Sequence, residues 1–498
     1  MSAMTAVFLF YLLVLLGLAV WSRRETHSLA GYFLAGRKLP SWVVAFSTNA
    51  TGESGWLLLG LTGMGYAVGA QAYWVVVGEV TGIALAWLLV ARRLKRLSDA
   101  SGAITVPDVL AARFGDTRHV LRGVSVLIIL VMVGVYVAAQ MVATGKAFST
   151  FMDMEYVTAV VLGGTVIIIY TMVGGYKAVA YTDLVQGILM LAGLIIVPLV
   201  AISAAGGWGN VSGVLNSIDP NLLSLWGSDG TGLRGWIVIV SFLAIGLPFL
   251  GVPQLMVRFM SARSEQALYK AGFISVLVIL LFDIGAVTAG MAGRALFPEL
   301  ADAETIFPTL ARELFPPVIT GILMVVVLAA IMSTVDSLLL LASSAVVRDF
   351  MQKIAGSVKS EESLAAYGKI LTLVIGVAGI AFAAVESPLI FWFVLFAWSG
   401  LGAAFGPVIL CALYYPRTTL SGAIAGVLGG FLTTVIWVLV FKARTYDLYE
   451  MVPGFLVGLL LTVVVSNVSG KIRAQKTSHR EERSDAAIPV TRARKRPW

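Results

Sequence analysis

Long runs of apolar residues recur along the whole chain and are separated by short polar segments. The runs have about 18 to 25 residues, the length that a helix needs to cross a hydrocarbon layer of roughly 30 Å. Membrane β-strands instead show segments of about ten residues in which polar and apolar positions alternate. The pattern therefore predicts an all-α integral membrane protein with thirteen transmembrane helices. The predicted spans are 4–22, 40–66, 68–91, 119–147, 157–174, 178–203, 236–258, 270–293, 316–346, 368–385, 388–414, 420–441 and 453–469.

Two of these spans are interrupted near their middle by helix-breaking residues. The span at 40–66 contains STNATGESGWLLLGLTG, and the span at 236–258 contains AIGLPFLGVPQ. Proline removes a backbone donor and glycine tolerates an unwound turn, so carbonyl groups are freed at a depth where they persist only beside a site. Either span alone is also compatible with a kinked helix that binds nothing. As a pair placed five helices apart, they predict inverted repeats at about 40–203 and 236–414, with a transport site at the midplane.

Five carboxylates lie within the predicted spans: Glu53, Glu79, Asp183, Asp283 and Asp336. An ionised carboxylate at the centre of a membrane helix costs roughly 2.5–3.5 kcal/mol on insertion scales, and such residues are mostly functional. Each of the five therefore needs a partner or a function.

The polar positions around Asp336 have the spacing of a cation site. Within IMSTVDSLLLLASSAV, at 331–346, Ser333, Asp336 and Ser337 fall on one helix face and present three oxygens to one point. Hard cations take oxygen ligands from carboxylate, hydroxyl and carbonyl groups. In the alternative interpretation, the serines bond to carbonyls of their own helix and the aspartate pairs with a basic residue of another helix. The sequence predicts no lysine or arginine at that depth, which favours the cation site.

Composition excludes several classes of function. Of the 498 residues, 59% are hydrophobic and 12% charged, whereas a soluble domain has roughly 45–50% apolar residues. The longest predicted loops have about thirty residues, too few for a catalytic domain, and the G-x-x-x-x-G-K-[ST] motif of ATP-driven pumps does not occur. The three histidines are scattered over loops and the tail, and Cys411 is the single cysteine. We therefore expect neither an enzyme nor an ATP-driven pump.

The positive charges lie mainly on one side of the predicted membrane. Of the 35 Lys and Arg residues, 29 fall on the side of the carboxy terminus and six on the other side. By the positive-inside rule, we expect a protein of the inner (plasma) membrane. Its amino terminus is predicted to be outside and its carboxy terminus cytoplasmic. Residues 1–470 are predicted to form one transmembrane domain, and 471–498 a basic, disordered cytoplasmic tail that binds anionic lipids, with protein docking as the alternative. The net charge of +8 thus indicates a membrane surface and not nucleic acid, and no obligate protein partner is predicted.

Several motifs are distributed over nearly the whole chain, and each of them alone is weak. They are YFLAGR from Tyr32, SGWLLLG from Ser54, GGYKAVAYTDLVQ from Gly174, RFM from Arg258, MST from Met332 and GAAFGP from Gly402, with Arg417 followed by Gly422 and Ala423. Taken together, they resemble the sodium/solute symporter family, and within it the bacterial sodium/proline symporters. The resemblance implies a five-plus-five inverted-repeat transporter fold, with one helix before the core and two after it, and Na+ as the coupling ion.

In this resemblance the main sodium ion lies between the interruption of the span at 40–66 and the span at 316–346. The ligands that it implies are the backbone carbonyls of Ala50, Glu53 and Ala330 and the hydroxyls of Ser333 and Thr334. Some relatives bind a second ion, and the equivalent positions of this chain are Asp183, Ser333, Asp336 and Ser337. A second sodium ion is therefore a further prediction.

The resemblance also implies a substrate pocket, which departs from the pattern of proline transporters. Those relatives have an aspartate where this chain has Gly52, and our hypothesis is that the carboxylate has shifted by one position to Glu53. Ile245 and Phe249 replace a tryptophan and a tyrosine, which makes the pocket more apolar, and the loss of polar groups changes selectivity. The predicted substrate-binding residues are Trp56, Tyr136, Ile245, Phe249 and Pro253.

We expect a sodium-coupled symporter that imports a small organic solute by alternating access, with proline or a related amino acid as the favoured substrate. A proton-coupled symporter is an alternative because Glu53, Asp183 and Asp336 can carry protons, and a sodium symporter for another small organic acid or solute is a second one. A channel would need a continuous polar path, whereas the polar positions cluster at the midplane. A transporter-like sensor would need a large cytoplasmic signalling domain, which this sequence is not expected to encode.

Overall fold

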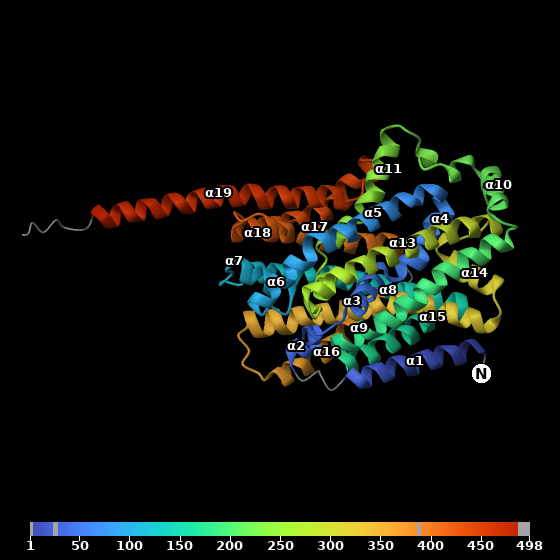
Figure 1. The fold of residues 1–498 in the computed structure, drawn as a ribbon, viewed down its shortest axis with the longest axis horizontal. Helices are drawn as coiled ribbons and strands as arrows, with labels where there is room; N and C mark the ends of the chain where they lie inside the picture. The colour runs from blue at the N-terminus through green and yellow to red at the C-terminus, as the bar shows by residue number, and fades with distance from the viewer. Residues whose placement is uncertain (1–2, 23–27, 386–389, 487–498) are drawn as a thin grey trace, which may run out of the picture.

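The computed structural model describes residues 3–22, 28–385 and 390–486, and these ranges consist of helices joined by turns and loops. Within them, an isolated bridge between Leu39 and Ala262 is the only β geometry. The longest helices run along the long axis of the molecule (Figure 1). The predicted all-α class is confirmed.

Ten helical stretches of the described chain are long and apolar enough to cross a membrane, as judged by length and composition, and two shorter apolar helices, Ala6–Ser22 and Tyr156–Met172, accompany them. The helices that carry these stretches are α1 (Ala3–Ser22), α3 (Ser41–Gly55), α4 (Thr62–Val68), α5 (Tyr73–Leu85), α8 (Val120–Met152), α9 (Tyr156–Ala204), α11 (Leu233–Ala244), α13 (Glu265–Leu296), α15 (Pro317–Ser344), α16 (Glu361–Ala383), α17 (Ile390–Tyr414), α18 (Leu420–Ile436) and α19 (Met451–Ala486). Shorter helices are α2 (Leu29–Leu34), α6 (Arg92–Ser101), α7 (Val106–Phe114), α10 (Trp208–Ile218), α12 (Pro253–Ser261) and α14 (Ile306–Leu314). These findings confirm a multi-pass membrane protein.

Both predicted helix interruptions occur. In the first, Ser54 has φ 55° and ψ −169°, and the chain continues as a π-helical segment, Trp56–Leu61, into α4. In the second, α11 is followed by a 3-10 turn, Leu247–Leu250, and an extended Val252 precedes α12. The sequence prediction placed the first break at Gly52 and Gly55, since glycine is the residue that usually adopts a positive φ. In the structure, the positive φ belongs to Ser54, which lies between them.

The helix α9 contains the predicted spans 157–174 and 178–203. Residues 175–177 lie between the two predicted spans. The first of them, Gly175, has φ 61° and ψ −171° and interrupts the helix. Glycine adopts this conformation without steric cost, so one residue is enough to turn the chain.

The residues at 471–486 belong to a helix in the structure, whereas the sequence prediction made them part of a disordered tail. The helix α19 continues to Ala486 and extends beyond the other helices at one end of the molecule (Figure 1). The residues at 471–486 contain neither glycine nor proline and are rich in Lys, Arg, Glu and Ala, which favour continuation of a helix. The rest of the predicted tail, 487–498, lies outside the described residues.

The helix α15 occupies the centre of the core. All of its residues from Leu323 to Ser344 are buried, and it packs against α3, α8 and α9. Its serines, threonine and aspartate therefore face other helices and not lipid, which is the placement that polar groups at membrane depth require.

Candidate functional site

Hydroxyl groups of α15 contact backbone carbonyls of α3. Ser333 Oγ donates a hydrogen bond to the Ala50 carbonyl at 2.8 Å, and Thr334 Oγ1 donates to the Thr51 carbonyl at 3.0 Å. Ser333 Oγ also donates to the Ala330 carbonyl of its own helix at 3.0 Å. All five residues are fully buried. Four of the five residues predicted for the main sodium site, Ala50, Ala330, Ser333 and Thr334, therefore lie together.

The fifth residue, Glu53, lies at the break in α3. Its carbonyl accepts a hydrogen bond from the Trp56 amide, and the next residue, Ser54, has a backbone conformation that costs a non-glycine residue about 1–3 kcal/mol. Such strain persists where the surrounding structure requires the conformation. The donor set around the break consists of carbonyl and hydroxyl oxygens, which suits a hard cation such as Na+.

The guanidinium of Arg258 lies at the position predicted for a second sodium ion. Its Nη2 is 3.1 Å from Asp183 Oδ2 and 2.7 Å from Thr51 Oγ1, and it also donates to Ser337 Oγ. Ser47 Oγ donates to the same Asp183 oxygen at 2.6 Å. The sequence predicted no basic residue at this depth, and that prediction was wrong. The break before Pro253 allows α12 to pack against α3 and α15 and to carry Arg258 into the core.

Asp336 is linked to this ion pair through Ser337 and also has a partner of its own. Tyr170 donates from its hydroxyl to Asp336 Oδ2 at 2.7 Å, and Ser337 Oγ lies 3.2 Å from Oδ1. The sequence interpretation missed both Arg258 and Tyr170. Arg258 was visible in the RFM motif, but its role required knowledge of how α12 packs.

Phe249 fills the space beside Gly52, the position at which the resemblance described above implies an aspartate. A Cβ atom on Gly52 would lie 3.0 Å from Phe249 Cε1. The Phe249 ring packs edge-on against Trp398 of α17, with ring centroids 5.1 Å apart. Trp398 Nε1 in turn donates to the Ile245 carbonyl at 3.0 Å. Trp398 was not predicted, and it contacts two of the predicted pocket residues.

The other predicted pocket residues are buried near the two breaks. Trp56 and Tyr136 are 3% and 1% exposed, the Tyr136 side chain contacts Ser54, and Pro253 begins α12. A cavity of about 220 Å³ borders Ile245, and Gln71, Asp229, Lys442 and Tyr449 also line it. Its lining thus includes Asp229, from the segment between α10 and α11, and Ile245, which directly follows α11. Two larger apolar grooves, between α8 and α16 and between α1, α9 and α15, touch none of the predicted pocket residues.

A cluster of ion pairs lies beyond the carboxy-terminal end of α15, where the chain continues as a π-helical segment. Arg122 contacts Asp108 at 2.7 Å and also Asp349, and Arg348 contacts Asp108 at 2.9 Å. Burial alone raises the pKa of Asp108, but the guanidiniums of Arg348 and Arg122 outweigh this effect and hold the pKa below its ordinary value. The cluster joins α7, α8 and the π-helical segment Ala345–Ile354.

Comparison with known sequences identifies relatives along almost the entire chain. The model of the sodium:solute symporter family matches residues 32–430. The high-affinity proline transporter PutP of Bacillus subtilis (strain 168) is 38% identical over 449 residues, which cover 89% of this chain and 93% of the relative. A sodium/proline symporter of Staphylococcus aureus is 35% identical over 474 residues, with 93% and 92% covered.

Comparison with solved structures shows the same fold in other transporters. A Na+-coupled sialic acid symporter in a substrate-bound, outward-open state matches with a TM-score of 0.79 at 19% identity, covering 94% of this chain and 98% of the other. The nucleobase-cation-symport-1 family transporter Mhp1, in a closed conformation, matches with a TM-score of 0.56 at 15% identity, covering 90% and 96%. At these identities the likeness concerns the fold alone.

Proposed function

Because this chain belongs to the sodium:solute symporter family, we infer that it is a sodium-coupled symporter that imports a small organic solute, with proline as its substrate. The named function of its relatives supports proline, since the matches to a proline transporter and a sodium/proline symporter extend over 89% and 93% of the chain. The observation that carries the sodium part is the buried set of carbonyl and hydroxyl oxygens between α3 and α15.

In this proposal, Na+ binds the carbonyl oxygens of Ala50, Glu53 and Ala330 and the hydroxyl oxygens of Ser333 and Thr334. The hydroxyls of Ser333 and Thr334 already lie beside carbonyls of α3, and to bind the ion each hydroxyl would turn its proton away from the carbonyl. It joins the strained break in α3 to α15 and thereby stabilises one conformation of the transporter.

We propose that proline binds between the two breaks, against Trp56, Tyr136, Ile245, Phe249 and Pro253. The amino terminus of α12, which begins at Pro253, favours the substrate carboxylate because of the helix dipole. Coupling then requires that the ion and the substrate both bind one conformational state better than the other, since a ligand without such a preference shifts no equilibrium.

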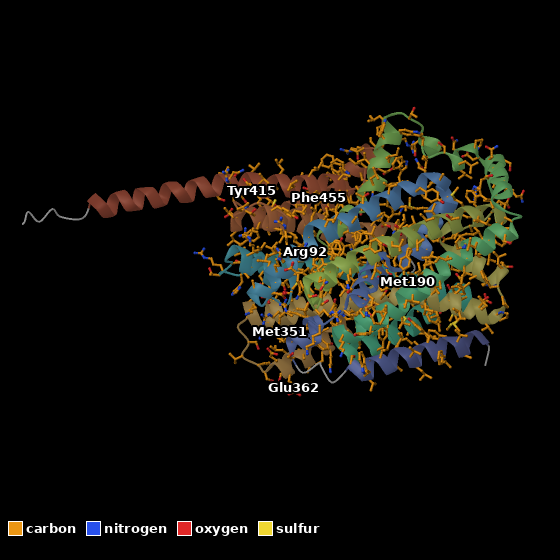
Figure 2. All side chains as sticks on the ribbon, in the orientation of Figure 1. Arg92, Met190, Met351, Glu362, Tyr415 and Phe455 are labelled. Carbon is orange, nitrogen blue, oxygen red and sulfur yellow. The ribbon has the colours of Figure 1, made fainter. Side chains whose placement is uncertain are left out.

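We further propose that the chain crosses the membrane thirteen times, with inverted repeats at about 40–203 and 236–414. The two helix breaks support this arrangement because each lies in the first helix of a proposed repeat. An external amino terminus and a cytoplasmic carboxy terminus are supported by the distribution of the 35 Lys and Arg residues; Arg92, one of those on the predicted inner side, lies in the half of the molecule from which α19 extends (Figure 2). A basic tail at 471–498 that binds anionic lipids fits this orientation.

A second sodium ion at Asp183, Ser333, Asp336 and Ser337 remains a conditional proposal. It would require Arg258 to release Ser337 Oγ, whereas Asp183 could keep its Oδ2 contact with Arg258 and offer Oδ1, which has no partner among the described residues. Proteins in which Arg258 is replaced by glutamine would test this condition through the sodium dependence of uptake.

The experiment that tests the proposed function is uptake of labelled proline into proteoliposomes that contain the purified protein. We expect accumulation under an inward sodium gradient, at equal pH on both sides, and competition by unlabelled proline. Full uptake driven by a proton gradient alone would reject sodium coupling in favour of the proton-coupled alternative. Sodium-driven uptake of another small organic acid, without competition by proline, would reject the proposed substrate while leaving the coupling ion intact.

A further inference from the structure

Three carboxylates meet inside the protein where α13 packs against α3 and α5. They belong to Glu53 of α3, Glu79 of α5 and Asp283 of α13, and one oxygen of each lies within 4.8 Å of the others. Glu53 and Asp283 are fully buried, and Glu79 is 3% exposed. The helix α13 packs against both α3 and α5, which brings the three side chains together. We call Glu53, Glu79 and Asp283 the carboxylate triad.

The fully buried Glu53 differs from Asp183 and Asp336 in having no protein partner at either carboxylate oxygen. Both oxygens of Glu53 lack a hydrogen-bond partner among the described residues, whereas the Glu79 carboxyl group interacts with that of Asp283 and with the side chain of Trp56. Asp183 has Arg258, and Asp336 has Tyr170. Buried charges without a counter-charge or a hydrogen bond are strongly unfavourable. The unpartnered oxygens of Glu53 therefore indicate a ligand that the protein itself does not supply.

The dimensions of the triad fit a single small cation. Sodium-sized ions contact oxygen ligands at about 2.3–2.6 Å, so two ligand oxygens on opposite sides of the ion are roughly twice that distance apart. Three oxygens no more than 4.8 Å apart leave a central point at most about 2.8 Å from each of them, so small movements of the side chains bring all three into contact with one ion. Carboxylate oxygens are hard ligands, which favours a hard cation over a soft transition metal.

The triad bears on the hypothesis that the aspartate of proline transporters at the position of Gly52 has shifted to Glu53. Phe249 fills the space beside Gly52, since a Cβ atom there would lie 3.0 Å from the Phe249 ring. One residue later, the helix has turned by about 100°, and the Glu53 side chain faces α5 and α13. The Glu53 carboxylate therefore belongs to a different site, about 100° around α3 from the position beside Phe249.

We propose that the carboxylate triad binds a small hard cation, and that this ion is Na+ during transport. The inference rests on the proposed sodium-coupled function and adds an ion site to it. Glu53 connects the two sites, because its backbone carbonyl belongs to the main sodium site and its side chain to the triad. Ions at both sites would act on the same break at Ser54.

The test is direct binding of radiolabelled sodium to the full-length protein in nanodiscs, without substrate. We expect Asp283→Asn to lower the bound sodium by one equivalent per protein. Thr334→Val, in the main site, is expected to remove one equivalent independently, so that the double variant loses both. Glu79→Gln is the second triad variant, for the case that Asp283→Asn does not elute as a folded protein in size-exclusion chromatography. Glu362→Gln, at an exposed carboxylate of α16, is the matched control and is expected to bind as much sodium as the wild type.

Unchanged sodium binding, in stoichiometry and affinity, in both folded triad variants would overturn the proposal. Binding of Ca2+ at lower concentrations than Na+, lost in the same variants, would overturn the assignment to Na+. These outcomes are distinct from a failure of the proposed function. If sodium did not drive proline uptake by the wild type, the symport mechanism would be rejected, whereas sodium-driven uptake together with unchanged ion binding in the variants would reject the triad site alone.

Discussion

Replacement of Thr334 by valine tests the main sodium site with a minimal change of shape. The substitution removes the hydroxyl that donates to the Thr51 carbonyl at 3.0 Å and that we propose as a ligand of the ion. Loss of a neutral hydrogen bond costs about 0.5–1.5 kcal/mol, and loss of a polar contact to a charged group about 1.5–3 kcal/mol. The first value applies to the stability of the protein without sodium, and the second to the binding of the ion.

The larger value predicts that the sodium concentration for half-maximal proline uptake rises by about 10- to 150-fold in Thr334→Val. Thr334→Ser retains a hydroxyl and is expected to stay close to the wild type. The measurement is initial uptake of labelled proline into proteoliposomes over a series of sodium concentrations at saturating proline.

A matched control is Thr372→Val, because Thr372 is also fully buried and donates its hydroxyl to a backbone carbonyl, that of Gly368, at 3.0 Å. It lies on α16, away from the α3–α15 contact, so its sodium dependence is expected to remain that of the wild type. The reasoning would be refuted if Thr334→Val kept the wild-type sodium dependence, or if both valine variants raised the half-maximal concentration equally.

Three further predictions concern other parts of the structure. Arg258→Gln leaves Asp183 buried without its counter-charge and is expected to lower the midpoint of thermal unfolding. The double variant Arg258→Gln/Asp183→Asn is expected to recover part of this loss. Equal midpoints for the single and the double variant would contradict the ion pair as a stabilising contact. Gly52→Asp introduces a side chain against the Phe249 ring and is expected to abolish proline uptake, and Phe249→Ala in the same protein to restore it in part; a fully active Gly52→Asp single variant would show that Phe249 moves aside without cost. The pKa of Asp108 is lowered in the folded protein, so its ion pairs stabilise the protein at every pH above the ordinary pKa of an aspartate, about 3.9. This stabilisation is lost as the pH falls through the lowered pKa. Melting curves between neutral pH and about pH 3 should therefore show a smaller acid-induced loss of stability in Asp108→Asn, and identical pH profiles would disprove this assignment.

The sequence was sufficient to predict the helical class, the family and both helix breaks. These features depend on signals that are local in sequence, namely apolar runs, glycine and proline at membrane depth, and short motifs. The contact of Ser333 with Ala50 was also predictable, because the family motifs supplied the pairing of two distant segments. The membrane orientation and the ligands of the ions stay predictions.

The arrangement of the buried charges was not predictable from the sequence. Arg258 belongs to a short helix whose direction is set by the break before it, and no local pattern specifies that its guanidinium reaches Asp183. Similarly, Glu53, Glu79 and Asp283 are far apart in sequence, and only the packing of α13 against α3 and α5 brings them together. The helix beyond residue 470 was missed because a high charge density was given more weight than the absence of helix breakers.

The position of Arg258 has a consequence for how steeply the protein can concentrate its solute. One charge that crosses a potential of 100 mV provides roughly 2.3 kcal/mol, which corresponds to a solute concentration ratio of between one and two powers of ten. Every further ion multiplies the attainable ratio by the same factor. A guanidinium is covalently attached to the chain, so it neutralises Asp183 in every cycle without being carried to the other side. As long as it stays there, that aspartate contributes nothing to the electrical work, and the limiting concentration ratio depends on the ions bound elsewhere in the protein.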